Sequence, residues 1–272
     1  MNDVPDRTLW GAAEAYEAYM GRWSRQIAAR FLPWLDATPH ARWVDFGCGT
    51  GALSGQILET CRPTRLVGLD TSDGFLQAAR QSLPGAEFRL GDVTDTGLTS
   101  GEFDYAVSGL VLNFTRDPHA TLREMVRLVR PGGRAALYVW DYAGHMQIMR
   151  YFFDAARSID PSSTAFDDGI NAPICRPGPL RTALEAAGAV NVDVTALDIP
   201  AAFRDFDAYW TPFLGGTGSA PKYVAGLTGE MRERLRDAVR AKLPTGPDGE
   251  ILLAIRAWAV RGTRPDSRRS AG

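Results

Sequence analysis

The stretch WVDFGCGTGALS, residues 43–54, decides how the rest of this sequence is organised. It begins with apolar residues typical of a buried strand, passes through Gly47, Gly49 and Gly51, and ends in a segment that starts a helix. Glycine tolerates positive φ and has no side chain, so the backbone of such a turn can approach a ligand closely. A Gly-x-Gly-x-Gly turn can also be a tight strand-to-helix connection without a ligand.

Strand-like and helical segments alternate after this turn. The apolar runs predict strands at 42–47, 65–70, 86–92, 103–110 and 132–140, with helical patterns between them. Short buried strands alternating with helices are typical of a parallel sheet covered on both faces, with right-handed crossovers. The sequence therefore predicts an α/β fold, and two further strands are expected at 190–197 and 251–262.

The chain length and the spacing of these strands predict a single domain over residues 1–272, with insertions. The segments 141–189 and 204–248, which precede the two late strands, are longer than a minimal crossover. Loops of that length usually cap or build a site, so we expect them to form a helical cap. The polar residues 263–272 are expected to be a disordered tail.

Composition excludes several classes of partner. The chain has 45% hydrophobic and 23% charged residues and a formal net charge of -2, which gives no net attraction to nucleic acid or an anionic membrane. No apolar run approaches the roughly 18 residues of a membrane span, and the acidic start is unlike a signal peptide, so a cytoplasmic location is expected. The spacing of three cysteines and three histidines suggests neither a disulfide framework nor a metal site. The oligomeric state stays open.

Acidic residues follow two of the predicted strands where a ligand of an open α/β sheet would bind. Asp70, about 20 residues after the glycines, can accept hydrogen bonds from both hydroxyls of a ribose, whereas capping of the next helix is better served by Ser72 and Asp73. Asp92 can accept from an adenine amine beside the apolar flank of Val93, or can be an ordinary turn aspartate. Successive acids after a glycine turn favour a nucleoside-containing ligand.

Five stretches together carry a family resemblance: VDFGCGTG, GLDTSDGFLQAAR, GDVTD, FDYAVSGLVLNF and LVRPGGRAALYVW. Over about residues 42–140 the sequence resembles the class I S-adenosylmethionine-dependent methyltransferases, in their small-molecule (type 11-like) branch. The resemblance implies a Rossmann-like, seven-stranded, mostly parallel sheet whose last strand is antiparallel. Nicotinamide-binding enzymes prefer Gly-x-Gly-x-x-Gly, a spacing that this turn lacks.

The resemblance implies S-adenosylmethionine as cofactor and S-adenosylhomocysteine as its product. By position, it assigns Gly47, Cys48, Gly49 and Gly51 to the methionine part, Asp70 to the ribose, Thr71 and Phe75 to the adenine, Asp92 and Val93 to the adenine edge, and Ser108 and Asn113 to the amino-acid end or the substrate. Nothing beside Cys48 marks it as a low-pKa nucleophile, so we expect it to be a small side chain in the loop.

The N-terminal residues 1–36 carry apolar side chains at close to helical spacing, from Tyr16 to Trp34, and predict a helix packed on the sheet. Tyr19 and Arg22 lie off this stripe. The segment resembles the N-terminal lid helix of small-molecule members of the family, where such residues close over the cofactor and an arginine could pair with a carboxylate. A solvated surface position is the alternative for both residues.

Methyl transfer from a sulfonium requires alignment of a nucleophile and exclusion of water, and a base is optional. For an acceptor of high pKa, a base after the strand at 132–140 would help, and the candidates are Asp141, Tyr142 and His145. His145 can equally be a surface residue that opens the next helix. The catalytic residue is therefore left unassigned.

The acceptor is expected to be a small molecule. The sequence has SGLV after the fourth strand where nucleobase-methylating relatives have an Asn/Asp-Pro-Pro-aromatic stretch, and it lacks a basic stripe. Aromatic residues of the two insertions could cover a small organic acceptor or pack the core of the cap: Phe152, Phe153, Phe166, Tyr209, Trp210, Phe213 and Tyr223. We expect O-, N- or C-methylation; the alternatives are a non-catalytic cofactor-binding protein and a nicotinamide-nucleotide oxidoreductase.

Overall fold

The computed structural model describes residues 21–215 and 218–266. One sheet contains seven strands in the order β3-β2-β1-β4-β5-β7-β6. These are β1 (Arg42–Phe46), β2 (Arg65–Asp70), β3 (Glu87–Leu90), β4 (Phe103–Gly109), β5 (Val129–Trp140), β6 (Val190–Phe203) and β7 (Ile251–Thr263). Strands β1 to β5 pair in parallel, and β7 runs antiparallel between β5 and β6. The expected Rossmann-like α/β fold, mostly parallel with an antiparallel last strand, is confirmed.

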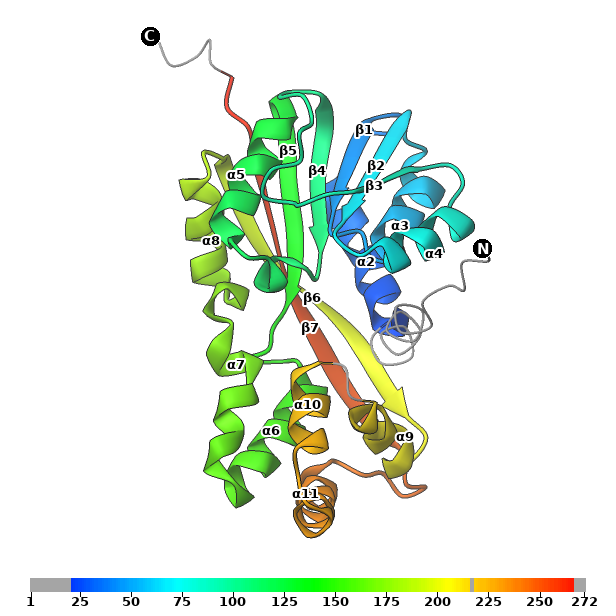
Figure 1. Cartoon of the computed structure of the whole chain (residues 1–272), viewed down its shortest axis with the longest axis vertical. Coiled ribbons are helices and arrows are strands. Elements are labelled where there is room, and N and C mark those ends of the chain that lie inside the picture. Colours follow the sequence, from blue (N-terminus) through cyan, green and yellow to red (C-terminus); the bar gives the residue numbers. More distant parts are fainter. Residues whose placement is uncertain (1–20, 216–217, 267–272) are drawn as a thin grey trace, which may run out of the picture.

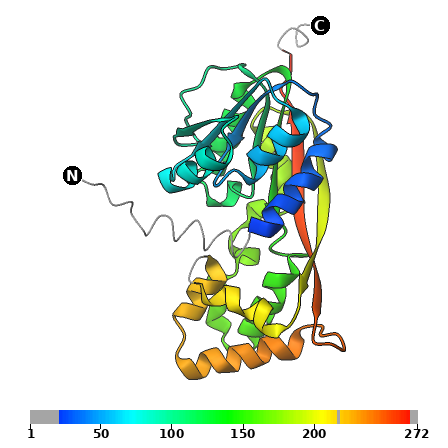
Figure 2. The same cartoon turned by 90° about the vertical axis from the view of Figure 1, so that its right-hand side faces the viewer.

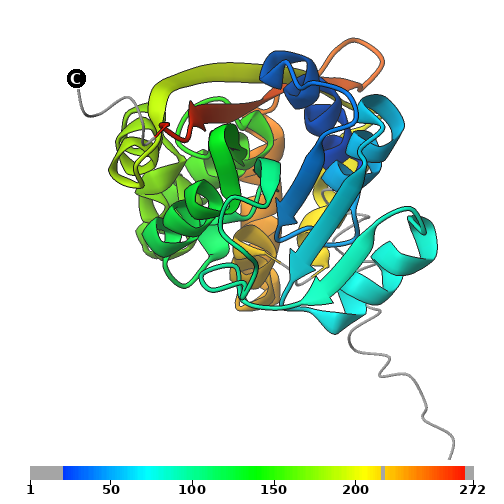
Figure 3. The same cartoon turned by 90° about the horizontal axis from the view of Figure 1, so that it is seen from above.

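Helices cover both faces of this sheet, as Figure 3 shows. They are α2 (Arg22–Leu35), α3 (Ala52–Cys61), α4 (Asp73–Ser82), α5 (Pro118–Leu128) and α8 (Pro177–Ala186). Helix α2 contacts α3 on one face, and α5 contacts α8 on the other. Right-handed crossovers produce this division, because the chain moves outward from β1 to β3 in one direction and from β4 to β6 in the other.

The predicted apolar stripe of the N-terminal segment packs on the sheet. Trp23, Ile27 and Phe31 are buried, and the Phe31 ring lies 4.9 Å from that of Tyr138 in β5. Burial of such side chains stabilises the fold by roughly 1.5–3 kcal/mol each. The part of the predicted lid at 1–20 lies outside the described residues, so only α2 represents that segment here.

Strands β6 and β7 are longer than predicted and leave the sheet together. The ladder between them continues to the pair Phe203 and Ile251, far beyond the last pairing of β7 with β5. Figure 1 shows this two-stranded ribbon running from the sheet down to a layer of helices at the lower end, and Figure 2 shows it along one side of the molecule. The cap thus hangs on a continuous hydrogen-bonded ladder rather than on flexible linkers.

The cap contains five helices and three short 3-10 turns among the described residues. They are α6 (Gln147–Ile159), η3 (Pro161–Phe166), α7 (Asp168–Asn171), η4 (Pro173–Cys175), α9 (Phe206–Trp210), η5 (Thr211–Leu214), α10 (Ser219–Ala225) and α11 (Gly229–Lys242). The predicted insertion at 141–189 also holds α8, which contacts β6 and β7. That helix covers the sheet, so the cap part of this insertion ends before it.

Most cap aromatics pack against one another. Phe152 is fully buried, and its ring stacks 4.6 Å from that of Phe213, with Trp210 and Tyr223 next in the same cluster. Of the two alternatives for these aromatics, packing of the cap core therefore applies to them. Phe166 lies at the edge of this cluster: its ring is 5.4 Å from that of Tyr223, but 38% of its surface stays exposed and it lines the cavity.

The boundary predicted for the disordered tail, residue 263, is too early in the sequence, because this residue still belongs to β7. Thr263 is the last residue of β7 and pairs with Arg134, and Arg264 donates hydrogen bonds to the Arg127 and Val129 carbonyls. These contacts order the chain beyond the predicted boundary. In residues 21–215 and 218–266 no helix is long and apolar enough to cross a membrane, and no group of possible ligands is placed to hold a metal ion.

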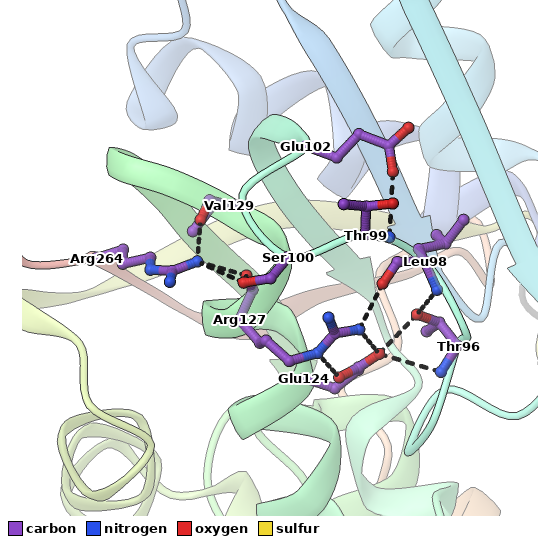
Figure 4. A network of polar contacts seen from close by, with 9 residues as sticks. All are labelled: Thr96, Leu98, Thr99, Ser100, Glu102, Glu124, Arg127, Val129 and Arg264. Carbon is purple, nitrogen blue, oxygen red and sulfur yellow. Dashed lines mark hydrogen bonds and ion pairs between the residues drawn. The ribbon is translucent and has the colours of Figure 1, made fainter.

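A polar network anchors the loop between β3 and β4 to α5 (Figure 4). Glu124, 7% exposed, accepts hydrogen bonds from the Thr96 amide and hydroxyl and pairs with Arg127. Arg127 also donates to the Leu98 carbonyl at 2.8 Å. One buried carboxylate therefore holds the loop and the helix together.

Replacing this carboxylate should destabilise the protein in a pH-dependent way. Burial raises the pKa of Glu124, but hydrogen bonds from Arg127 and Thr96 more than offset this and hold it below its ordinary value. The stabilisation is therefore present above the unfolded pKa, about 4.3, and is lost as pH falls through the folded pKa. We expect Glu124→Gln to lower the free energy of unfolding by about 1–3 kcal/mol at pH 7 in urea titrations, with a smaller difference near pH 3.5.

The matched control is Glu185→Gln on the exposed face of α8, which should change stability little at either pH. A Glu124→Gln variant as stable as the parent at neutral pH would contradict the role assigned to the network.

Candidate active site

A cavity of about 890 Å³ lies at the carboxyl ends of the strands and extends to the cap. Its sheet side is lined by Asp45, Gly47, Cys48, Gly49, Asp70, Thr71, Phe75, Asp92 and Val93. Its centre is lined by Gly109, Leu110, Val111, Tyr138, Trp140 and Tyr142, and its cap side by Met146, Met149, Phe166, Asp168, Asn171, Ser219 and Lys222. Pockets of this size hold drug-sized ligands, so the cavity has room for a nucleoside cofactor and a small second molecule.

The glycine turn forms one wall of the cavity, and its three glycines serve different purposes. All three have positive φ, 67° at Gly47, 55° at Gly49 and 94° at Gly51. A Cβ atom at Gly51 would lie 2.5 Å from Leu83, and this glycine does not line the cavity. A Cβ atom at Gly49 would meet nothing within 4 Å, which is open space for a ligand. Close packing explains Gly51, whereas Gly49 faces room for a ligand.

Asp70 connects the turn to the end of β2. Its Oδ2 accepts from the Gly49 amide at 2.9 Å and its Oδ1 from the Ser72 amide at 2.8 Å. Ser72 is the N-cap of α4 and accepts from the Phe75 amide, so the capping alternative for Asp70 is already taken. Burial raises the pKa of Asp70, although these backbone hydrogen bonds oppose the shift. The Asp70 carboxylate therefore lines the cavity, and the hydrogen bonds from the Gly49 and Ser72 amides fix its orientation.

Asp92 and Val93 also line the cavity. They follow β3, the edge strand next to β2. Asp92 Oδ1 accepts from both the amide and the hydroxyl of Thr94, at 2.8 Å each, and the amide hydrogen bond is the main cause of its lowered pKa. Its carboxylate is exposed and stays ionised at neutral pH. The predicted contact of this pair with an adenine edge is compatible with that position.

Several predicted site residues do not line the cavity. Ser108 is buried, and its hydroxyl donates to the Phe46 carbonyl at 2.8 Å, which ties β4 to β1. Asn113 lies in the turn η2 (Leu112–Phe114) with its Oδ1 buried and unpartnered. The Arg22 guanidinium lies 4.2 Å from the centroid of the Trp23 ring and 5.1 Å from that of Phe203, and Arg22 does not line the cavity. Tyr19 lies outside the described residues.

The three candidates for a catalytic base differ in whether they line the cavity. Tyr142 lines the cavity, whereas Asp141 and His145 do not. Asp141, 5% exposed, accepts from the His145 amide at 2.8 Å and so holds the turn before α6. The His145 side chain is exposed. Cys48 lines the cavity, but burial raises the pKa of its thiol far above neutrality, so it is no nucleophile.

Asp45 is a site residue that the sequence analysis missed. It is 1% exposed and lines the cavity; its Oδ2 accepts from the Ser54 hydroxyl at 2.7 Å, whereas its Oδ1 is buried without a partner. Burial raises the pKa of this carboxyl to about 7. The available sequence signal was an acid among apolar strand residues, two positions before Gly47.

Leu110, which follows β4, has a backbone conformation that the sequence analysis did not predict. It lines the cavity with φ 64°, a left-handed conformation that costs a non-glycine residue of order 1–3 kcal/mol. Its amide donates to the Tyr138 carbonyl at 2.8 Å, which holds this conformation. This strained residue lies at the centre of the cavity lining.

Removing the Asp70 carboxylate should weaken cofactor binding. We expect Asp70→Ala to reduce the affinity for S-adenosylhomocysteine by about 1–3 kcal/mol, because the ribose loses its acceptor and Gly49 loses its hydrogen bond. Calorimetric titration measures this, with Asp237→Ala on the exposed face of α11 as the control. An unchanged titration curve for Asp70→Ala would remove this residue from the site.

Asp45 should make cofactor binding release protons. Its pKa of about 7 leaves part of the free protein protonated, and a bound cation beside Oδ1 would favour the carboxylate. Affinity should therefore rise with pH up to about 7 and then level off. Titration of S-adenosylhomocysteine near pH 6 in two buffers of different ionisation enthalpy measures the released protons. Asp45→Asn should abolish the release; equal release from both proteins would exclude Asp45 as its source.

Comparisons with known proteins agree with this geometry. Residues 44–137 match the family model of the methyltransferase domain. The chain is 29% identical over 252 residues to trans-aconitate 2-methyltransferase of Deinococcus radiodurans, which covers 89% of this chain and 95% of that protein. It is 34% identical over 122 residues to malonyl-(acyl-carrier protein) O-methyltransferase of Serratia marcescens, or 45% of this chain and 47% of that protein. The latter match spans about half of each chain.

A solved structure shares the fold. Phosphoethanolamine N-methyltransferase 2 of Haemonchus contortus, in complex with S-adenosyl-L-methionine, superposes with a TM-score of 0.59 at 15% identity, over 96% of this chain and 59% of that one.

The residues present here fit the same cofactor. Asp45 has an unpartnered buried oxygen suited to a cation, Gly49 faces open space, and Asp70 offers a directed carboxylate. Neither the nicotinamide alternative nor the non-catalytic one is retained. The matched methyltransferase domain, the relatives and the fold place this chain among the class I S-adenosylmethionine-dependent methyltransferases.

Proposed function

We propose that this enzyme methylates a carboxylate oxygen of a small organic acid and so forms a methyl ester. The names of two relatives, trans-aconitate 2-methyltransferase and malonyl-(acyl-carrier protein) O-methyltransferase, both refer to acceptors that carry a carboxylate. The observation that carries the proposal here is Lys222, which lines the cap side of the cavity and forms no salt bridge within residues 21–215 and 218–266. A free ammonium at this position can attract an acid and hold it by its charge.

The walls between the two ends of the cavity are largely apolar. Leu110, Trp140 and Tyr142 are buried and line this part. Such walls exclude water from the reacting atoms and restrict the orientation of the acceptor, which are the main contributions a protein can make to this reaction.

When bound, S-adenosylmethionine would supply a methyl group already activated by a sulfonium. A carboxylate oxygen of the acceptor would form a bond to the methyl carbon while the carbon–sulfur bond breaks, and the electron pair of that bond would stay on sulfur. Because a small carboxylic acid is ionised at neutral pH, no side chain needs to remove a proton. This agrees with the position of Asp141 and His145 outside the cavity lining.

Ester formation tests the proposal. The purified protein is incubated with S-adenosylmethionine and a panel of small acids with one, two or three carboxylates, and we expect S-adenosylhomocysteine together with a base-labile methyl ester of at least one acid, detected by mass spectrometry. Lys222→Met should raise KM for the acid by about tenfold, because one ion pair is lost, and leave the affinity for S-adenosylhomocysteine unchanged.

Lys242→Met, at the exposed end of α11, is the matched control and should behave like the parent. Exclusive N- or C-methylation of other compounds, with no ester from any acid, would contradict the proposal.

A further inference from the structure

The cap side of the cavity holds a second charged group, of sign opposite to Lys222. Asp168 begins α7 and lines the cavity. One of its oxygens, Oδ2, accepts from the Ser219 hydroxyl of α10. Its other oxygen, Oδ1, has no hydrogen-bond partner in the part of the chain that the structure describes. The cap therefore presents one unused carboxylate oxygen at the cavity.

The segment that carries Asp168 is held firmly in place. The neighbouring Asp167 is buried, forms a salt bridge with Arg150 and accepts from the Gly169 amide at 2.9 Å. At Gly169 there is no space for a side chain, because a Cβ atom would lie 2.8 Å from the Tyr142 carbonyl. Asp168 is thus positioned by α7, α10 and the turn that follows β5 together, as a preorganised binding group requires.

The charge of Asp168 is not paired within the cavity. Arg150 forms its salt bridge with Asp167, and Lys222 lines the same cavity without a salt bridge to either aspartate among the described residues. Burial raises the pKa of Asp168, with Asp167 adding to the shift and Ser219 opposing it. An unpaired, partly buried carboxylate favours a ligand that supplies a hydrogen-bond donor or a positive charge.

We propose that the acceptor carries, besides the carboxylate attracted by Lys222, a hydroxyl or ammonium group that donates a hydrogen bond to Asp168. This inference rests on the proposed function and narrows its substrate class to hydroxy or amino monocarboxylic acids. A second carboxylate at the same position meets the negative charge of Asp168 and is rejected. Asp168 is therefore a specificity-determining residue, and it makes this enzyme select against diacids.

The rejection follows from general physical reasons. Like charges at short range in a partly desolvated site oppose binding strongly, and a buried acceptor left without its donor is also unfavourable. Sites built to hydrogen-bond a substrate hydroxyl or amine discriminate well against analogues that lack it. Pentanoate has neither a donor group nor a second carboxylate, so its affinity should lie between that of the favoured acids and that of glutarate.

A matched series of five-carbon acids tests the inference: pentanoate, 5-hydroxypentanoate, 5-aminopentanoate and glutarate. Binding of each acid is measured by calorimetry with the protein saturated with S-adenosylhomocysteine, and kcat/KM is measured with S-adenosylmethionine. The parent should favour the hydroxy and amino acids over glutarate. Asp168→Asn should change this preference by about tenfold or more in favour of glutarate, without changing the affinity for S-adenosylhomocysteine.

Two further variants complete the test. Ser219→Ala keeps the carboxylate but removes its hydrogen bond, and should reduce the preference for the hydroxy acid severalfold. Asp237→Asn, on the exposed face of α11, should leave all preferences as in the parent.

The outcomes separate the two proposals. If acids bind and are esterified but Asp168→Asn leaves the preference between glutarate and 5-hydroxypentanoate unchanged, the role of Asp168 is refuted and the proposed function stands. If no acid binds the S-adenosylhomocysteine complex or yields an ester, the proposed function fails and the inference fails with it. If Asp168→Asn changes the preference between 5-hydroxypentanoate and glutarate and Asp237→Asn does not, both the proposed function and the role of Asp168 are supported.

Discussion

The glycine turn after β1 is the constraint on which the remaining structure depends. Val111 lies 2.4 Å from where a Cβ atom of Gly47 would stand, and Leu83 lies 2.5 Å from that of Gly51. Larger residues at either glycine would push away the chain after β4 or the end of α4. Because all three glycines also have positive φ, the turn can adopt this shape only with glycine at low cost. Through the Gly49 amide, the same turn is hydrogen-bonded to Asp70 and hence to the end of β2.

The ribbon of β6 and β7 is the second determinant of the site. It carries the cap to the far side of the cavity, so that Asp168 and Lys222 line the same space as the strand ends although their places in the sequence are remote. The aromatic core around Phe152 and Phe213 packs the helices of this layer together. The sheet thus provides a cofactor site common to the fold, and the cap provides the groups that can distinguish one acceptor from another.

Prediction from sequence succeeded where local pattern and topology agree. Strand ends of a parallel sheet meet at one edge, so Asp70 and Asp92 were found from their position alone, and both line the cavity. The pattern failed where a side chain has a nearer partner. Ser108 sits at a strand end, but the Phe46 carbonyl takes up its hydroxyl. Asp141 follows β5 as predicted, yet it closes its own turn instead of facing a ligand.

The sequence by itself determined the order and type of the elements, the glycine turn and the acids that follow β2 and β3. These depend on short-range periodicity and on backbone chemistry, which neighbouring residues encode. Only the tertiary structure decided that Asp45 lines the cavity with an unpartnered oxygen and that Asp168 and Lys222 lie across from the glycine turn. Burial and long-range proximity arise from packing of distant segments, and no local pattern specifies them.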